Sequence, residues 1–243
     1  MTDIVKYMSK APIVSVLIPV FNEEKTVRRV IDSVLAQDYK KMLLGNPEII
    51  VIDDHSTDKT YSILQQLAKE RNIRIVRHGI NQGKGAAIRT GISKATGDYI
   101  IIQDADLEYS PNDYPKLLSP LVKKQADVVY GSRMRLKTPP EFYVSLLGNK
   151  VLTYSTNMLF GSKLSDVFVG YKAFTNKSIE GLQLQSNGFD IEIELTAYFL
   201  KRKLRILEVP ISYHGRGWEE GKKITVVHGI DSLFKIFKYR FSE

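Results

Sequence analysis

The sequence predicts an α/β protein, with a mostly parallel sheet flanked by helices and an amphipathic helix at the C-terminus. Short β-branched, apolar runs alternate with amphipathic segments through the first half of the chain, which is typical of βαβ units. Acidic or polar side chains follow directly after four of these runs, as expected where the carboxyl ends of parallel strands form a ligand-binding edge. The length of 243 residues and the hydrophobic content of 43% predict one large domain with a sizeable core.

The first half of the chain contains expected strands over residues 13–20, 48–53, 73–77, 99–102 and 127–130. Asn22, Glu23 and Glu24 are expected to cap a helix that ends near residue 37. Residues 56–58 are expected to cap a second helix, which ends near residue 71. Further helices are expected over residues 86–95 and 111–124, so that strands and helices alternate as a parallel sheet requires.

The second half is less regular. Helices are expected over 143–160, 188–201 and 226–241, strands over 172–175 and 205–213, and a glycine-rich basic loop over 214–223. One face of helix 226–241 carries the apolar residues Ile230, Leu233, Phe234, Phe237 and Phe241. Because its other faces are basic, this helix is expected either to lie at a membrane interface or to pack on the domain. We therefore divide the chain into a domain of residues 1–223 and a basic amphipathic helix of residues 224–243.

Composition narrows the functional classes. The chain has no cysteine, which excludes disulfides and fits a reducing compartment. Residues 1–10 show no secretory signal, and no run reaches the ~18 apolar residues of a membrane span. The formal net charge of +8 predicts an anionic partner: a nucleic acid, a phosphorylated substrate or an anionic membrane surface. Carboxylates at several strand ends would repel a nucleic acid, so no nucleic acid partner is expected.

Residues 97–108 read G-D-Y-I-I-I-Q-D-A-D-L-E, a buried strand that ends in Asp104 and Asp106, with Glu108 two residues further on. Closely spaced carboxylates repel each other unless a cation lies between them. Hard oxygen ligands favour Mg²⁺ or Mn²⁺, which bind through one or two carboxylates and complete their coordination with substrate phosphates. This motif therefore predicts a divalent metal site, and the alternative is a solvated acidic turn.

Residues 81–85 read N-Q-G-K-G and precede an expected helix. Glycines allow close backbone approach to a ligand, and a helix N-terminus favours anions, so the loop is a candidate phosphate contact; the alternative is a flexible turn. The spacing is not that of a P-loop, and no G-x-G-x-x-G occurs in the chain. A dinucleotide-binding oxidoreductase is therefore not expected.

Together these segments resemble family 2 glycosyltransferases with the GT-A fold. The resemblance is carried by V-S-V-L-I-P-V-F-N-E-E, I-I-V-I-D-D-H-S-T-D-K-T, N-Q-G-K-G-A-A and the acidic motif of residues 97–108. The later segments V-V-Y-G-S-R, S-D-V-F-V-G-Y-K-A-F, G-F-D-I-E and E-V-P-I-S-Y resemble the polyprenyl-phosphate branch. That branch includes the dolichyl-phosphate mannose and glucose synthases.

The resemblance implies roles for individual residues. Positions that match the family's nucleotide-binding residues are Pro19, Phe21, Asn22, Glu23, Asp53 and Lys84. Asp104 and Asp106 match the motif that meets the ribose, the metal and the donor diphosphate. Glu108 stands where the mannose synthases often have a glutamine as a further metal ligand. Arg133 matches an arginine that contacts phosphates, and Arg216 and Lys222 match a basic loop near the donor diphosphate.

Two positions leave alternatives open. The mannose synthases have a second arginine after the Gly-Ser-Arg segment, whereas no arginine falls in register here; Arg135, Lys137 and Lys150 are the candidates to replace it. Asp190 lies near the place where family members with hydroxyl acceptors keep a general base, and its alternative role is a helix cap.

The resemblance implies inverting, Mg²⁺- or Mn²⁺-dependent transfer of a hexose from a UDP-Glc or GDP-Man type donor to a polyprenyl or dolichyl monophosphate. The alternative acceptor is a saccharide hydroxyl in cell-surface polysaccharide or glycan synthesis. A nucleotide-sugar-binding module without catalysis is the alternative from another class. We expect a cytoplasmic protein, bound peripherally at the cytoplasmic face of a membrane.

Overall fold

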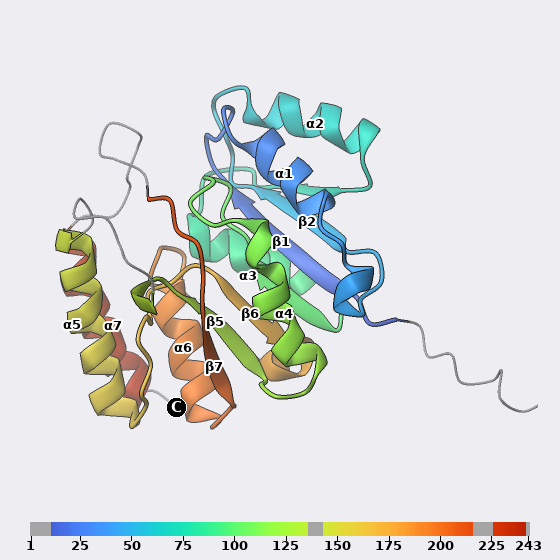
Figure 1. The fold of residues 1–243 in the computed structure, drawn as a ribbon. Helices are drawn as coiled ribbons and strands as arrows, with labels where there is room; N and C mark the ends of the chain where they lie inside the picture. Colours follow the sequence, from blue (N-terminus) through green and yellow to red (C-terminus); the bar gives the residue numbers. More distant parts are fainter. Residues whose placement is uncertain (1–10, 136–142, 216–225, 242–243) are drawn as a thin grey trace, which may run out of the picture.

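The computed structural model describes residues 11–135, 143–215 and 226–241. Its centre is a seven-stranded sheet with the order β3-β2-β1-β4-β6-β5-β7 (Figure 1). The strands are β1 (Val14–Val20), β2 (Glu48–Asp53), β3 (Arg74–Arg77), β4 (Tyr99–Ile102), β5 (Val128–Ser132), β6 (Lys172–Thr175) and β7 (Ile206–Pro210). β6 runs antiparallel to both its neighbours, β4 and β5, whereas the other pairings of neighbouring strands are parallel. The mostly parallel α/β sheet predicted from the sequence is confirmed.

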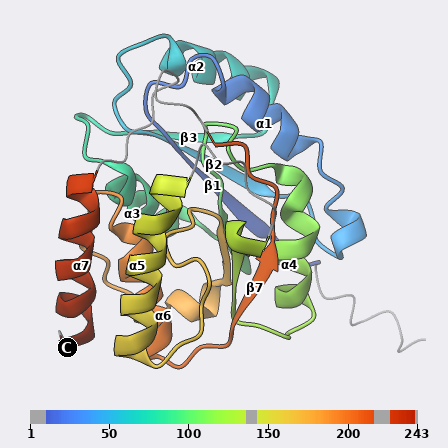
Figure 2. The ribbon, with the colours of Figure 1, turned by 60° about the vertical axis from the view of Figure 1, so that its left-hand side comes forward.

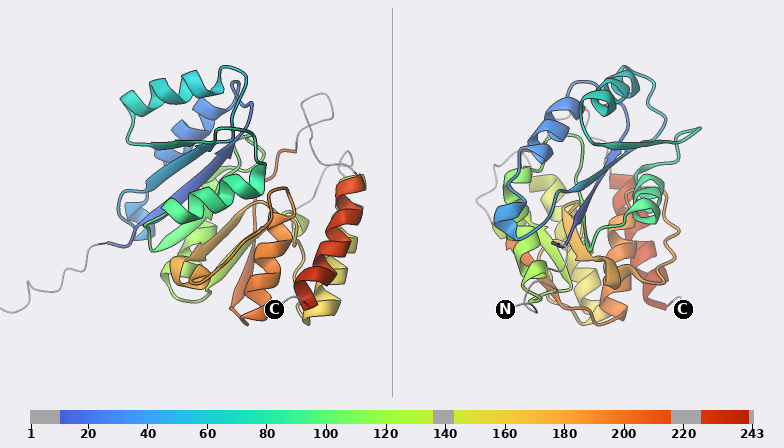
Figure 3. Two further views of the ribbon diagram at one scale, coloured as in Figure 1. Left: turned by 180° about the vertical axis from the view of Figure 1, so that it is seen from behind. Right: turned by 90° about the vertical axis from the view of Figure 1, so that its right-hand side faces the viewer.

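Helices cover both faces of the sheet. They are α1 (Val27–Leu35), α2 (Thr60–Glu70), α3 (Lys84–Lys94), α4 (Tyr114–Val122), α5 (Tyr143–Phe160), α6 (Ile191–Lys201) and α7 (Val226–Phe241). Figure 3 shows α1 and α4 on one face and α3 and α6 on the other. The central strands are buried on both faces, which explains their continuous β-branched sequences.

Helices α5 and α7 lie side by side at the outside of the molecule, where they pack against α6 (Figures 1 and 2). A small core of Leu152, Ile193 and Ile236 joins the three helices. The bounds predicted for α5 and α7 match the structure. Within the described residues, no helix combines the length and the apolar character needed to cross a membrane.

Several predicted boundaries differ from the structure for local reasons. Helix α3 begins at Lys84 rather than at residue 86, so that Lys84 belongs to its first turn. Strand β7 ends at Pro210, which has no N–H for a further ladder bond. Asn22 does not cap α1, because its side-chain oxygen accepts a hydrogen bond from the Thr57 N–H (2.8 Å) instead.

Candidate active site

The loops that follow β1 and β2 are bonded to each other at the carboxyl edge of the sheet. Asn22 adopts a left-handed φ of 55° after β1, and its N–H donates to the Ser56 hydroxyl at 3.0 Å. Asp53 is fully buried; it accepts from the Ser56 N–H (3.1 Å) and pairs with Arg77 at 3.0 Å. These contacts hold the loops that follow β1 and β2 in a fixed arrangement, which we call the β1–β2 shelf.

The other residues predicted for nucleotide binding lie beside this shelf. Pro19 is buried within β1, opposite Ile52 of β2. Phe21 follows β1 and is partly exposed, whereas Glu23 is buried, with its N–H bonded to the Thr60 hydroxyl at 2.8 Å. The structure thus brings the predicted positions after β1 and β2 together.

Asp54, a residue to which the sequence assigns no role, holds the N-Q-G-K-G loop. Its carboxylate accepts from the N–H groups of Gln82 (2.9 Å) and Gly83 (2.7 Å) and from the His78 ring (2.7 Å). Gly83 has φ of 93°, and a Cβ there would lie 2.4 Å from the Asn187 carbonyl oxygen. The loop is therefore clamped between the end of β2 and the segment that leads into α6.

This clamp places Lys84 next to the acidic motif. The Lys84 ammonium lies 2.7 Å from Asp104 Oδ1 and 3.0 Å from Asp104 Oδ2, and 3.4 Å from Glu192 Oε1. Burial lowers the pKa of Lys84, but the charges of Asp104 and Glu192 outweigh burial and the net pKa lies above the ordinary value. The Lys84 side chain, from the first turn of α3, is therefore a cation that lies beside Asp104.

Glu192 is in turn paired with Lys172, the first residue of β6. Both side chains are buried, at 2% and 0% exposure. Burial lowers the pKa of Lys172. Burial raises the pKa of Glu192, but the charges of Lys172 and Lys84 outweigh burial, and the net pKa of Glu192 is lowered. Lys172 also donates to the carbonyl oxygens of Val167 (3.2 Å) and Val169, which holds the Glu192 carboxylate in place.

The acidic motif turns sharply after β4. The buried Gln103 side chain donates to the carbonyl oxygens of Asp104 (3.0 Å) and Tyr109 (3.2 Å), which closes the turn. Asp106 Oδ1 accepts from the Glu108 N–H at 3.1 Å, and the Glu108 carboxylate accepts from the Tyr213 hydroxyl at 3.1 Å. Glu108 thus points to Tyr213, beyond the end of β7.

Across residues 11–135, 143–215 and 226–241, no group of three His, Cys, Asp or Glu side chains could hold a metal ion by itself. Two carboxylates nonetheless fit Mg²⁺ or Mn²⁺, which commonly take one or two protein carboxylates and complete their coordination with substrate phosphates. Asp104 and Asp106, at the end of β4, meet this requirement. Gly170 also leaves room at Asp104, since a Cβ there would lie 2.6 Å from Asp104 Oδ2.

Arg133 forms a two-point ion pair with Asp166, with both contacts at 2.8 Å. The Asn149 amide of α5 donates to the same carboxylate at 2.6 Å. Burial raises the pKa of Asp166, but the Arg133 guanidinium outweighs burial and the net pKa lies below the ordinary value of 3.8. Glu208 of β7 accepts from the Ser165 and Asp166 N–H groups, so that it fixes the turn that carries Asp166.

The structure describes the side chain of one of the three candidates for a second basic residue, Lys150. Lys150 is exposed on α5, and Lys137 and the side chain of Arg135 lie outside the described residues. The structure instead places the neutral Asn149 beside the Arg133–Asp166 pair. Arg216 and Lys222 also lie outside the described residues.

Asp190 lies at the N-terminus of α6 and contacts α7. Its carboxylate pairs with Lys235 at 3.1 Å and accepts from the Tyr239 hydroxyl at 3.4 Å. Burial raises its pKa, but hydrogen bonds from Ser186 and Lys235 outweigh burial and lower the net pKa. The Asp190 carboxylate is therefore bonded to α7 and has a lowered pKa.

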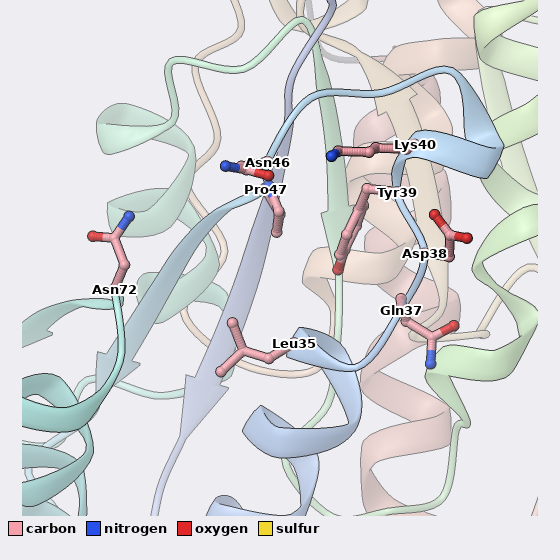
Figure 4. A pocket seen from close by; sticks show the side chains of 8 residues that line it. All are labelled: Leu35, Gln37, Asp38, Tyr39, Lys40, Asn46, Pro47 and Asn72. Atoms are coloured by element: carbon pink, nitrogen blue, oxygen red, sulfur yellow. The ribbon is translucent and has the colours of Figure 1, made fainter.

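A pocket lies at the opposite end of the sheet (Figure 4). Its lining comes from segments before β2 and β3 and from the end of α1, with Asn46, Asn72 and Leu35 among them. Ligands of parallel sheets bind at the carboxyl ends of strands, so this pocket is separate from the candidate active site.

Comparison with known proteins identifies the family. The sequence profile described as glycosyl transferase family 2 matches residues 15–182, more than half of the chain. The chain belongs to this family. It is a glycosyltransferase, and the predictions of family and enzyme class are confirmed.

Two relatives are similar over almost the whole chain. The first is the UDP-N-acetylglucosamine–dolichyl-phosphate N-acetylglucosaminyltransferase of Methanococcus voltae, at 29% identity over 93% of each chain. The second is the dolichol-phosphate mannosyltransferase of Pyrococcus furiosus, at 28% identity over 93% of this chain and 64% of that protein. Relatives of this glycosyltransferase thus transfer sugars to dolichyl phosphate.

A solved structure confirms the predicted GT-A fold. Glucosyl-3-phosphoglycerate synthase from Mycobacterium tuberculosis, in complex with Mn²⁺, UDP and glucosyl-3-phosphoglycerate, aligns with a TM-score of 0.67. The identity is 20%, over 94% of this chain and 80% of that one. This neighbour therefore binds Mn²⁺ together with a nucleotide.

Proposed function

We propose that this glycosyltransferase transfers a hexose from a UDP- or GDP-sugar to a polyprenyl monophosphate, with inversion at the anomeric carbon. The observation that carries the choice of acceptor is that both carboxylates at the start of α6 are engaged. Asp190 pairs with Lys235, and Glu192 lies between Lys84 and Lys172. A hydroxyl acceptor needs a base in hydrogen-bond reach, whereas a phosphate monoester is already anionic and needs none.

In this proposal the donor lies along the carboxyl edge of β1, β2 and β4. Phe21, Asn22 and Glu23 after β1 and Asp53 at the end of β2 hold the base and ribose, with Pro19 shaping the strand beneath them. Asp104 and Asp106 would hold Mg²⁺ or Mn²⁺, whereas the Glu108 carboxylate is bonded to the Tyr213 hydroxyl. The bound cation supplies neutralisation of the negative charge on the leaving diphosphate.

The reaction then needs only positioning and charge from this chain. A phosphate oxygen of the acceptor attacks the anomeric carbon from the side opposite the diphosphate, the bond to the diphosphate oxygen breaks, and the nucleoside diphosphate leaves. Lys84 faces the diphosphate, and Arg133, held by Asp166, faces the acceptor phosphate. Arg216 and Lys222 are proposed as further diphosphate contacts on the segment that follows His214.

A lipid acceptor requires a surface that meets the membrane, and α5 and α7 together offer one. Val151, Tyr154 and Met158 on α5 are 49%, 70% and 63% exposed. Phe234, Phe237 and Phe241 on α7 are 73%, 47% and 74% exposed at the same i, i+3, i+7 spacing. We call these six residues the α5–α7 apolar face.

The charges around the α5–α7 apolar face are complementary to anionic lipid. Residues 148–160 and 232–241 contain lysines and an arginine and no aspartate or glutamate. Basic and aromatic residues on adjacent amphipathic helices are typical of a membrane-interface element. The catalytic domain of residues 1–223 would thus bind peripherally through helix 224–243 at the cytoplasmic face of a membrane.

The test offers the purified protein a matrix of donors and acceptors. UDP-Glc, UDP-GlcNAc and GDP-Man are each incubated with Mn²⁺ and either a short-chain polyprenyl phosphate or soluble oligosaccharides. We expect sugar to appear in the organic phase with polyprenyl phosphate alone. Transfer only to oligosaccharide hydroxyls would replace the proposed acceptor, and donor binding without turnover on any acceptor would contradict a transferase that uses these substrates.

A further inference from the structure

The Lys84 ammonium contacts both oxygens through which Asp104 would bind a divalent cation. It lies within 3.0 Å of both Asp104 carboxylate oxygens. A Mg²⁺ ion requires an oxygen at about 2.1 Å, so the cation and the ammonium would share one carboxylate at short range. Two positive charges about 4 Å apart repel each other strongly near a protein surface. A cation bound at Asp104 would therefore favour movement of the Lys84 ammonium away from it.

Glu192 offers the place to which it can move. Glu192 Oε1 is buried, lacks a hydrogen-bond donor among the described residues, and lies 3.4 Å from the Lys84 ammonium. The other oxygen, Oε2, is fixed by Lys172, which is itself held by two backbone carbonyl groups. The lysine stem is flexible, whereas the anchored carboxylate is not. A movement of less than 1 Å would close the Lys84–Glu192 hydrogen bond.

We propose that Lys84 is a built-in counterion of Asp104, and that its ammonium passes to Glu192 when a divalent cation binds Asp104. The inference rests on the proposed function, because it takes Asp104 as a ligand of the cation. Glu192 is then a positioning residue that lowers the repulsion between Lys84 and the cation. Lys172 acts one step further away, by holding Glu192 where the ammonium can reach it.

The test measures Mn²⁺ binding directly, by the electron paramagnetic resonance signal of free Mn²⁺, with no sugar donor present. Lys84→Met removes the competing ammonium, and we expect it to bind Mn²⁺ about tenfold more tightly than the wild type. Glu192→Gln weakens the receiving site, and we expect about tenfold weaker binding. Lys94→Met, an exposed lysine at the other end of α3, is the matched control for loss of one positive charge.

The double variant separates an indirect role of Glu192 from a direct one. If Glu192 acts through Lys84, Glu192→Gln should change Mn²⁺ binding by less than about threefold in the Lys84→Met background. Equal weakening in both backgrounds would mean that Glu192 acts on the cation through its own charge, and would overturn the proposal. Melting curves by circular dichroism identify a variant that fails to fold. If Glu192→Gln fails to fold, the comparison of Mn²⁺ binding by Lys84→Met and by Lys94→Met decides whether the proposal stands.

Mn²⁺ binding distinguishes a failure of the counterion proposal from a failure of the proposed metal site. If the wild type binds Mn²⁺ and Lys84→Met binds it no more tightly, the counterion proposal is wrong and the metal site stands. If the wild type binds no Mn²⁺, alone or with UDP or GDP, the metal site of the proposed function fails, and the counterion proposal fails with it.

Discussion

The two halves of the chain reach the same edge of the sheet by different routes. From β1 to β5, strands and helices alternate, and the acidic motif, Asp53 and Arg133 follow directly from strand ends. From α5 onward, two of the three helices, α5 and α7, pack at the outside of the molecule. Asp166 lies on a turn, Lys172 on the antiparallel strand β6 and Glu192 on α6. The first half thus carries most of the candidate site residues, and the second half supplies partners for Lys84 and Arg133.

Asp104→Asn in the first half should have the largest effect on activity. Loss of one carboxylate charge at the cation and diphosphate should lower kcat/KM by about 10³-fold, whichever acceptor is used. Initial rates with polyprenyl phosphate provide the measurement. Asp32→Asn, a half-exposed aspartate on α1 in a 3.8 Å pair with Arg71, is the control and should retain full rate. If Asp104→Asn kept more than a tenth of the wild-type activity, Asp104 would not have the proposed role in the reaction.

Asp166→Asn tests whether the second half mainly holds the first. The substitution leaves the Arg133 guanidinium, whose side chain is 15% exposed, without its fully buried anion, so the free energy of unfolding should fall by about 3 kcal/mol near pH 7. The pKa of Asp166 is lower in the folded than in the unfolded protein. Its contribution is therefore present above about pH 4 and disappears as pH falls through the folded-state value.

Urea unfolding of the wild type and of Asp166→Asn between pH 7 and pH 3 measures this prediction. The difference between the two curves should shrink as the solution becomes acidic. A difference that stays constant down to pH 3 would show that the Asp166 charge does not stabilise the fold.

The α5–α7 apolar face separates membrane binding from the chemistry. Phe234→Ser with Phe237→Ser should weaken binding to vesicles that contain anionic lipid by about tenfold, because two aromatic side chains no longer enter the interface. Vesicle flotation is the measurement. Leu43→Ser with Ile80→Ser removes two apolar side chains, each 69% exposed, that belong to neither α5 nor α7, and this variant should bind as the wild type does. If both double variants lost vesicle binding equally, the effect would come from surface hydrophobicity in general and not from the α5–α7 apolar face.

Asp190→Asn should have the smallest effect. With polyprenyl phosphate as acceptor we expect kcat/KM to change by less than about threefold, because no proton has to be removed. A melting curve controls for the lost Lys235 pair. Loss of turnover in a folded Asp190→Asn protein would instead identify this carboxylate as a general base and favour a hydroxyl acceptor.

The sequence predicted what depends on local periodicity. The strand ends that carry Asp53, Asp104 and Arg133 follow from β-branched runs and their polar ends, and the structure places them at one edge. The family resemblance then supplied the chemistry of these positions. Individual roles at the site remain predictions.

The residues that hold the site were not predicted, because their partners lie far apart along the chain. Lys172 and Glu192 are separated by 20 residues, and Arg133 and Asp166 by 33. A charged residue within an apolar run was the available signal, as for Lys172 at the start of K-A-F-T and Asp166 before V-F-V. Such a signal indicates that a partner exists without identifying it.

The reversed direction of β6 has a mechanical consequence. Because the strand starts at the carboxyl edge, Gly170, two residues before it, lies against the Asp104 carboxylate, and Lys172, its first residue, reaches Glu192. Ladder bonds to β4 and β5 brace this strand from both sides, so amide protons here should exchange slowly with deuterium. If the proposed substrates bind at this edge, any movement that admits them would therefore occur outside β6.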